Sequence, residues 1–252
     1  MTESIYFDKY DVRGAYHWVE CDRSYANWKR YNPTLEARYD LTVRAIRELG
    51  VCGRLLDVGC GDGYLMSRVA PMMESVVGVD SEESAIRLAR QKLHKFINCK
   101  VTATTGYDLP FLERSFDVVV LGDVIEHLKE PAHHLKEIGR VLQPGGALVL
   151  TTPKWRADRK WDIRHEKEYR TEELRTLLAE FFDRVDTRYF WPLSWSRFYA
   201  TRVGWRLLKL VALTVRNPFL SMSESKPDQF GQILAVCRNP RQTECHPERP
   251  KI

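Results

Sequence analysis

Short runs of β-branched residues alternate with amphipathic stretches through the middle of the chain. The apolar runs predict strands at residues 54–58, 75–79, 100–104, 116–121 and 147–151. The stretches between them predict helices at residues 64–70, 82–95 and 131–142. Strands that alternate with helices in this way are typical of a doubly wound α/β fold with a parallel sheet.

The pattern becomes less regular after Thr152. Residues 154–170 read as a mixed-charge loop, and Thr171 is the predicted N-cap of a following helix whose first turn contains acidic residues. Residues 182–190 and 232–237 are predicted to form a closing pair of strands. A long segment lies between these two strands, and we expect it to be an insertion into the domain.

A glycine-rich turn follows the first predicted strand. The sequence Asp57-Val58-Gly59-Cys60-Gly61-Asp62-Gly63 runs from that strand into a helix, and the second strand ends at Asp80. Glycines allow a tight turn and let backbone N–H groups approach a ligand. A carboxylate at the end of the second strand is where a nucleotide-binding sheet binds ribose hydroxyls. The third glycine comes one residue too early for the dinucleotide fingerprint, because Tyr64 takes its place.

The D-x-G-x-G-x-G pattern resembles motif I of the class I S-adenosylmethionine-dependent methyltransferases. Further matching segments follow in the family's order, at residues 76–81, 108–111, 116–120, 122–128 and 140–146. The branch it resembles includes ubiquinone-pathway O-methyltransferases and many natural-product and glycan enzymes. The resemblance implies a Rossmann-like, seven-stranded, mostly parallel sheet. It also implies an N-terminal helical lid (1–50) and a methyltransferase domain (51–238) with an insertion before the last strand. Residues 239–252 contain three prolines and show no periodicity, which predicts a flexible tail.

The resemblance also implies S-adenosylmethionine as the cofactor and assigns residues to it. Asp80 would bind the ribose hydroxyls and Ser81 would lie beside the adenine. Thr105 stands where the family often has an acidic residue at the adenine amino group, and its hydroxyl can still accept that hydrogen bond. The full set of assigned positions is Asp57, Gly59, Cys60, Gly61, Gly63, Asp80, Ser81, Thr105, Gly106, Tyr107 and Gly122.

Two histidines are candidates for a general base, which an acceptor hydroxyl would need. His127 follows the fourth predicted strand, near the point where ligands bind in doubly wound sheets. His165 lies in the loop before Thr171, in a run that resembles the substrate-side loop of this branch. The alternatives are a bracing role for His127 and a solvated loop position for His165. One Glu and one Asp near His127 are too few ligands for a metal ion, and we predict none.

Other positions have less specific interpretations. The run Tyr16-His17-Trp18 is a third candidate, either as part of a lid over the cofactor or as a helix packed on the sheet edge. Arg30 or Arg38 is expected to meet the cofactor carboxylate. His133 and His134 are interpreted as surface residues of a helix.

The positive charge of the chain is concentrated in one segment. The chain has 39 Lys and Arg against 34 Asp and Glu, a formal charge of +5. Residues 187–223 contain six Arg and Lys and no acidic residue, so the rest of the chain sums to −1. Within them, residues 198–216 predict an apolar helix with Arg202, Arg206, Lys209 and Arg216 on one stripe. Such a helix either packs on the body or on a second copy in a homodimer, or it lies on an anionic membrane. Its narrow positive face makes nucleic acid an unlikely partner.

The remaining features suit a cytoplasmic protein, either free or peripheral at a membrane. The first residues are polar and acidic, with no sign of a signal peptide, and the six cysteines show no zinc-site spacing. We therefore expect an S-adenosylmethionine-dependent O-methyltransferase that acts on a small, amphipathic or lipid-linked acceptor. A tRNA or protein methyltransferase and a non-catalytic cofactor-binding protein remain as alternatives.

Overall fold

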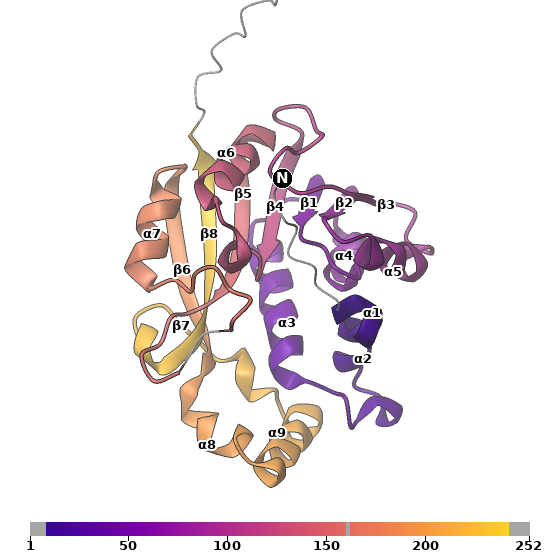
Figure 1. Ribbon diagram of the computed structural model, residues 1–252, viewed down its shortest axis with the longest axis vertical. Coiled ribbons are helices and arrows are strands. Elements are labelled where there is room, and N and C mark those ends of the chain that lie inside the picture. The colour runs from indigo at the N-terminus through magenta and orange to yellow at the C-terminus, as the bar shows by residue number, and fades with distance from the viewer. Residues whose placement is uncertain (1–8, 160–161, 242–252) are drawn as a thin grey trace, which may run out of the picture.

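The computed structural model describes residues 9–159 and 162–241, which fold around one mixed sheet. Its eight strands lie in the order β3-β2-β1-β4-β5-β8-β6-β7 (Figure 1). The strands are β1 (Arg54–Val58), β2 (Ser75–Asp80), β3 (Cys99–Ala103), β4 (Phe116–Gly122), β5 (Leu142–Pro153), β6 (Phe182–Pro192), β7 (Met222–Ser223) and β8 (Phe230–Pro240). Neighbouring strands from β3 to β5 are parallel, whereas β8, β6 and β7 join by antiparallel pairing. The doubly wound α/β prediction is therefore confirmed.

The predicted number of strands, seven, is one too low. The additional strand is β7, whose two residues pair with Tyr189 and Phe190 at the edge of the sheet. A two-residue strand has no room for the alternating pattern that identifies strands in a sequence. It was therefore missed.

Helices cover both faces of the sheet, as Figure 1 shows. The α-helices are α1 (Lys9–Arg13), α2 (Tyr16–Glu20), α3 (Pro33–Glu48), α4 (Tyr64–Val69), α5 (Glu83–Leu93), α6 (Pro131–Val141), α7 (Thr171–Ala179), α8 (Ser196–Tyr199) and α9 (Arg202–Thr214). Helices α3, α4 and α5 share one apolar cluster with one face of the sheet, and α6 and α7 share a second cluster with the other face. Leu55 and Leu56 enter opposite clusters, because successive strand residues point to opposite faces. The glycine loop and the ends of the parallel strands lie at the edge between these two layers.

Two predicted boundaries are wrong in detail. Thr171 is the first residue of α7 rather than its cap, and Glu173 accepts a hydrogen bond from the backbone N–H of Arg170 at 2.9 Å. Strand β8 continues to Pro240, so the tail cannot begin at residue 239. Residues 242–252, the rest of that predicted tail, lie outside the described residues, as do residues 1–8 of the predicted lid.

The predicted helix at 198–216 is two helices. Helix α8 ends at Tyr199 and α9 begins at Arg202, with the Thr201 hydroxyl accepting a hydrogen bond from Gly204 N at 3.0 Å. The corner is tight, since a Cβ on Gly204 would lie 2.2 Å from the carbonyl oxygen of Phe198. The insertion is also shorter than 187–223, because residues 187–192 belong to β6 and Met222–Ser223 form β7.

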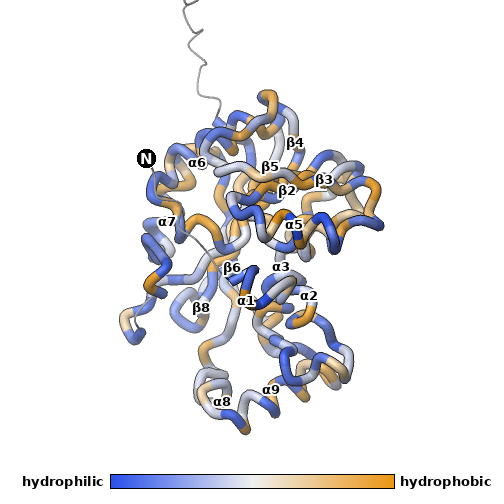
Figure 2. The backbone as a smooth tube through the Cα atoms, turned by 45° about the vertical axis from the view of Figure 1, so that its right-hand side comes forward, coloured by the Kyte–Doolittle hydropathy of each residue, from blue (hydrophilic) through white to orange (hydrophobic). Residues whose placement is uncertain are grey.

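The expected stripe of four cations is not present. Lys209 is buried, and its Nζ donates to the carbonyl oxygen of Lys29 at 2.9 Å, while Arg216 lies beyond the end of α9. Hydrophobic and hydrophilic residues are mixed along α9, as the colouring in Figure 2 shows. Among the described residues, no helix has both the length and the apolarity that a membrane crossing requires.

Candidate active site

The glycine loop connects β1 to α4 in a conformation that only glycine adopts easily. Gly59, Gly61 and Gly63 have φ angles of 77°, 55° and 76°, in the left-handed region. A Cβ on Gly59 would lie 2.4 Å from Val124 after β4, and one on Gly61 would lie 2.1 Å from the Tyr10 hydroxyl of α1. The loop is therefore packed between the end of β4 and the N-terminal helices.

Two carboxylates lie beside this loop, Asp57 buried and Asp80 half-buried. Asp80, at the end of β2, accepts hydrogen bonds from Gly61 N at 2.8 Å and Glu82 N at 2.9 Å. Burial raises the pKa of Asp80 even so, against the effect of these N–H groups. Burial, and then the charge of Asp80, raise the pKa of Asp57 to about 7. Cys60 is buried in the same loop, whereas Ser81 is exposed.

The residues assigned to the adenine lie after β3. Gly106 has a φ of 74°, and a Cβ there would lie 2.6 Å from the His134 ring. The Tyr107 ring meets the His134 ring edge-on, with centroids 5.2 Å apart, while Thr105 is exposed. On the other side of β1, Gly122 ends β4 and leads into Asp123, which forms an ion pair with Arg38 of α3 and accepts a hydrogen bond from Thr151 at 2.8 Å.

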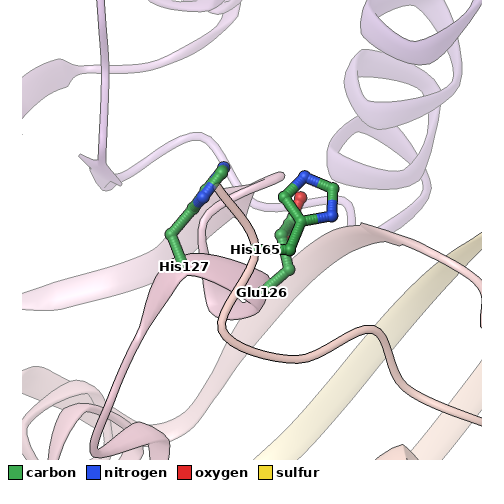
Figure 3. A group of neighbouring side chains, drawn as sticks. All are labelled: Glu126, His127 and His165. Atoms are coloured by element: carbon green, nitrogen blue, oxygen red, sulfur yellow. The ribbon is translucent and has the colours of Figure 1, made fainter. Parts of the chain in front are cut away.

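His127 and His165, which sequence reasoning treated as separate candidates, lie together. Their ring centroids are 4.9 Å apart, and the two ring planes are nearly perpendicular. His127 belongs to the short 3-10 turn Ile125–His127 that follows β4, and His165 comes from the loop after β5 (Figure 3). The backbone holds them together, because Glu166 N and Lys167 N both donate to the carbonyl oxygen of Glu126, at 2.8 and 3.1 Å.

The Nδ1 atom of each histidine has a hydrogen-bond acceptor. His127 Nδ1 lies 3.0 Å from the Arg164 carbonyl oxygen, and His165 Nδ1 lies 3.0 Å from Glu168 Oε1. These acceptors favour the tautomer with the proton on Nδ1 and the lone pair on Nε2. Burial, opposed by the hydrogen bond to Arg164, lowers the pKa of His127. The pair is therefore suited to accept a proton or a metal ion through Nε2.

Helix α2 is attached to the loop through Asp62. Its buried carboxylate accepts hydrogen bonds from His17 N at 3.1 Å and His17 Nδ1 at 3.0 Å. Its carbonyl oxygen accepts from Trp18 Nε1 at 3.0 Å. His17 and Trp18 thus pack over the glycine loop rather than on the sheet edge.

Comparison with known proteins assigns this arrangement to a family. Residues 56–150 match the model of a methyltransferase domain. A "Probable S-adenosylmethionine-dependent methyltransferase" of Mycobacterium tuberculosis (strain ATCC 25618 / H37Rv) is 33% identical over 131 residues, which cover 50% of this chain and 47% of the relative. The chain has a class I S-adenosylmethionine-dependent methyltransferase domain.

Other similar proteins agree with this assignment. A ubiquinone biosynthesis O-methyltransferase of Parvibaculum lavamentivorans is 29% identical over 147 residues, covering 55% of this chain and 58% of the relative. The N-methyltransferase NodS from Bradyrhizobium japonicum, solved with S-adenosyl-L-homocysteine, has a TM-score of 0.61 at 20% identity. The alignment of the two structures covers 90% of this chain and 99% of that chain. At this identity it shows a likeness of fold alone. The chain spans about half the length of the curated relatives it matches.

The cofactor of this methyltransferase family, S-adenosylmethionine, fits the residues present. The left-handed glycines form a cradle in which a Cβ would collide with its neighbours, and the amides of that cradle lie beside Asp80. The Asp80 carboxylate accepts two backbone N–H groups and has lone pairs left for a ribose diol. Asp80 and the loop would thus bind the nucleoside and the methionine part of the cofactor.

The methyltransferase domain also contains functional positions that sequence reasoning missed. His134 is buried, and neither of its ring nitrogens has a hydrogen-bond partner among the described residues, so its assignment to the surface is wrong. Its place in the buried stripe of α6, with Leu135, Ile138 and Val141, was a signal that could have found it. Asp62 and Tyr10 gave no such signal, because their partners are distant in the sequence.

Proposed function

We propose that the protein is an S-adenosylmethionine-dependent O-methyltransferase for a small acceptor. The observation that supports this most directly is the His127–His165 pair beside the end of β4, each ring with its lone pair on Nε2. The curated ubiquinone biosynthesis O-methyltransferase adds support for oxygen as the methylated atom.

The chain's own residues have three tasks in this reaction. S-adenosylmethionine, when bound, supplies a methyl group already activated by its positively charged sulfur. The glycine loop and Asp80 orient the cofactor, which is catalysis by proximity and alignment. The N-terminal helices cover the loop and exclude water. One imidazole Nε2 accepts the acceptor hydroxyl proton, and the lowered pKa of His127 keeps that ring neutral, and thus able to act as a base, at pH 7.

The loop that carries His165 also contributes to a cavity of suitable size for an acceptor. This cavity has a volume of about 590 Å³ and is lined by Lys154, Trp155, Arg170 and Leu193, among others. Small-molecule sites commonly occupy 300–1,000 Å³. Its lining also contains four carboxylates, Asp158, Glu172, Glu173 and Asp228, beside the cationic and apolar groups. These carboxylates disfavour a polyanionic nucleic acid, and the mixed lining suits an amphipathic acceptor.

Transfer of a labelled methyl group tests the proposal. Phenol and alcohol acceptors, each paired with its amine analogue, are incubated with the protein and S-adenosyl[methyl-³H]methionine. We expect methylation of oxygen acceptors and a loss of about 10²–10⁴-fold in rate for His127→Ala with His165→Ala, with binding of S-adenosylhomocysteine preserved. His94→Ala, an exposed histidine of α5's C-cap, is the control. Unchanged turnover in the double variant contradicts the base assignment, and exclusive methylation of amines contradicts O-methylation.

We propose further that α9 docks the protein on an anionic membrane. Val203, Leu207 and Leu210 form an exposed apolar face, at 69%, 52% and 50% of their full exposure. Arg202 and Arg206 are exposed on the same helix, and residues 187–223 contain no acidic residue to repel an anionic surface. An apolar face with adjacent cations suits an interfacial helix.

Vesicle co-sedimentation tests this docking. Each Arg near an anionic surface contributes about 1 kcal/mol, so Arg202→Gln with Arg206→Gln should weaken partitioning about 30-fold. Leu207→Glu should weaken it further, whereas Ile97→Glu, at an almost fully exposed apolar residue before β3, should not. Equal recovery of all variants on phosphatidylserine vesicles contradicts the proposal. A dimer that Leu207→Glu dissociates, with no vesicle binding, assigns the face to a second copy instead.

A further inference from the structure

Three side chains at the end of β4 can converge on one point. Glu126, His127 and His165 offer a carboxylate oxygen and two imidazole nitrogens that all lie within 4.8 Å of one another. They project from the turn after β4 and from the loop after β5 (Figure 3). One carboxylate and two imidazoles form a ligand set that divalent transition metals bind in proteins.

Groups outside this set already orient the two imidazoles for coordination. The Arg164 carbonyl oxygen can only accept, so the contact of 3.0 Å requires a proton on His127 Nδ1. Arg159 Nη2 donates to Glu168 Oε2 at 2.7 Å, and the other oxygen of Glu168 accepts from His165 Nδ1. In metal sites, ligating histidines donate their second N–H to a carbonyl or carboxylate in this way. Both Nε2 atoms are therefore the coordinating nitrogens.

The carboxylate of the set is oriented as well. Glu126 is buried, and its Oε2 accepts a hydrogen bond from the Thr152 hydroxyl at 2.9 Å. Its backbone carbonyl accepts two N–H groups of the loop that carries His165. A buried carboxylate is costly unless a cation or several donors compensate its charge. Asp123 does not complete the set, because its oxygens bind Arg38 and Thr151.

We propose that Glu126, His127 and His165 bind one divalent transition-metal ion, best represented by Zn²⁺. Zinc ligands at about 2.0–2.1 Å from the ion lie roughly 3.3 Å apart in a tetrahedron. The distances between the three ligand atoms, now within 4.8 Å, must therefore shorten by about 1.5 Å at most. Mg²⁺ prefers oxygen ligands and is excluded by the two nitrogens.

This site would give the ion an open coordination position. Three protein ligands would leave room for a water or an acceptor oxygen, and a bound oxygen would release its proton to solvent water more readily. This catalytic role rests on the proposed function, whereas binding of the ion does not. A histidine whose Nε2 binds the ion cannot also use that lone pair as a general base. In the protein with bound metal, the ion would therefore activate the acceptor in place of the imidazole.

Metal content is the decisive measurement. The full chain, without an affinity tag, carries Cys52→Ser and Cys245→Ser to remove two thiols that could bind zinc on their own. After chelation it is equilibrated with Zn²⁺, or with Mg²⁺ for comparison, and the bound metal is counted after gel filtration. We expect one Zn²⁺ and no Mg²⁺ per chain, and visible d–d absorption bands when Co²⁺ replaces zinc.

Matched variants identify the ligands. His165→Ala and the isosteric Glu126→Gln should each weaken Zn²⁺ binding at least 10-fold and abolish the Co²⁺ spectrum. His94→Ala should leave both unchanged. Less than half a Zn²⁺ per chain in the unsubstituted protein, or undiminished binding in His165→Ala, overturns the metal site. Thermal unfolding is followed in parallel, and His165→Gln provides a second test if Glu126→Gln does not fold.

Binding of S-adenosylhomocysteine to the same samples separates the two proposals. Absence of that binding contradicts the methyltransferase proposal and leaves the zinc result valid. Intact cofactor binding without stoichiometric zinc contradicts the metal site alone.

Discussion

Asp62 is the attachment point of the N-terminal helices, and Asp62→Ala tests whether they are held over the glycine loop. The buried carboxylate accepts two hydrogen bonds from His17, at 3.1 and 3.0 Å. Burial lowers the pKa of His17, so at pH 7 its ring is neutral and the Nδ1–H donates to Asp62. The alanine variant removes both acceptors and leaves a buried ring without them.

The expected loss follows from these two bonds. A hydrogen bond to a charged group contributes about 1.5–3 kcal/mol, and the Trp18 contact with the Asp62 carbonyl remains in the variant. We therefore expect the free energy of local opening at Lys9–Glu20 to fall by about 3 kcal/mol. That corresponds to a roughly 150-fold increase in the open population.

Amide hydrogen exchange resolved along the chain measures this opening. Exchange at Lys9–Glu20 should accelerate about 150-fold in Asp62→Ala, while exchange in β4 and β5 stays unchanged. Asp62→Asn keeps an acceptor oxygen and should show a smaller change. Asp40→Asn is the control, since it removes a partly exposed ion pair with Arg68 of low expected value. Unaltered exchange at Lys9–Glu20 in Asp62→Ala would refute the reasoning.

Three further predictions concern the cofactor loop and its surroundings. Asp80→Ala should weaken S-adenosylhomocysteine binding at least 10-fold by calorimetry, because a charge-assisted contact to the ribose is lost, whereas Glu83→Gln on the exposed side of α5 should not. Gly61→Ala should lower the melting temperature, because its φ of 55° and the Tyr10 hydroxyl leave no place for a Cβ. Burial lowers the pKa of His134 to about 4, so the unfolded chain takes up its proton first as the pH falls from about 6.5 to 4. Stability should therefore fall over that range, by about 3 kcal/mol from His134 alone, and urea unfolding of His134→Leu should show a flatter pH dependence.

The sequence patterns located the central sheet well because strands and helices there obey short-range rules. Strand β1 matches its prediction at both ends, and the buried residues of α5, Ala85, Ile86, Ala89 and Leu93, follow the helical spacing of the predicted helix at 82–95. The family motifs supplied the cofactor loop in the same way. Such patterns report which face of an element is buried, and the two apolar layers over this sheet follow from them.

The insertion was harder to predict because tertiary contacts decide its shape. The apolar run from 198 to 216 contains only a weak signal of a break: Thr201 is a residue type favoured at N-caps, and Gly204 weakens a helix interior. The break depends on the close approach of Gly204 to Phe198. Lys209 looked like a surface cation, and its burial depends on the carbonyl groups of Trp28 and Lys29. Periodicity contains no information on a partner that lies far away in the sequence.

The two histidines illustrate the same limit at the candidate site. Taken singly, His127 and His165 each had a structural alternative, and nothing in the sequence joined them. Their proximity follows from two backbone hydrogen bonds to the Glu126 carbonyl, which any residue type at positions 166 and 167 other than proline could donate. Glu168, which fixes the His165 tautomer, read as one more charge in a mixed-charge loop. The choice between two bases thus becomes a question about one cluster, and substitution of Glu168 should weaken whichever role His165 performs.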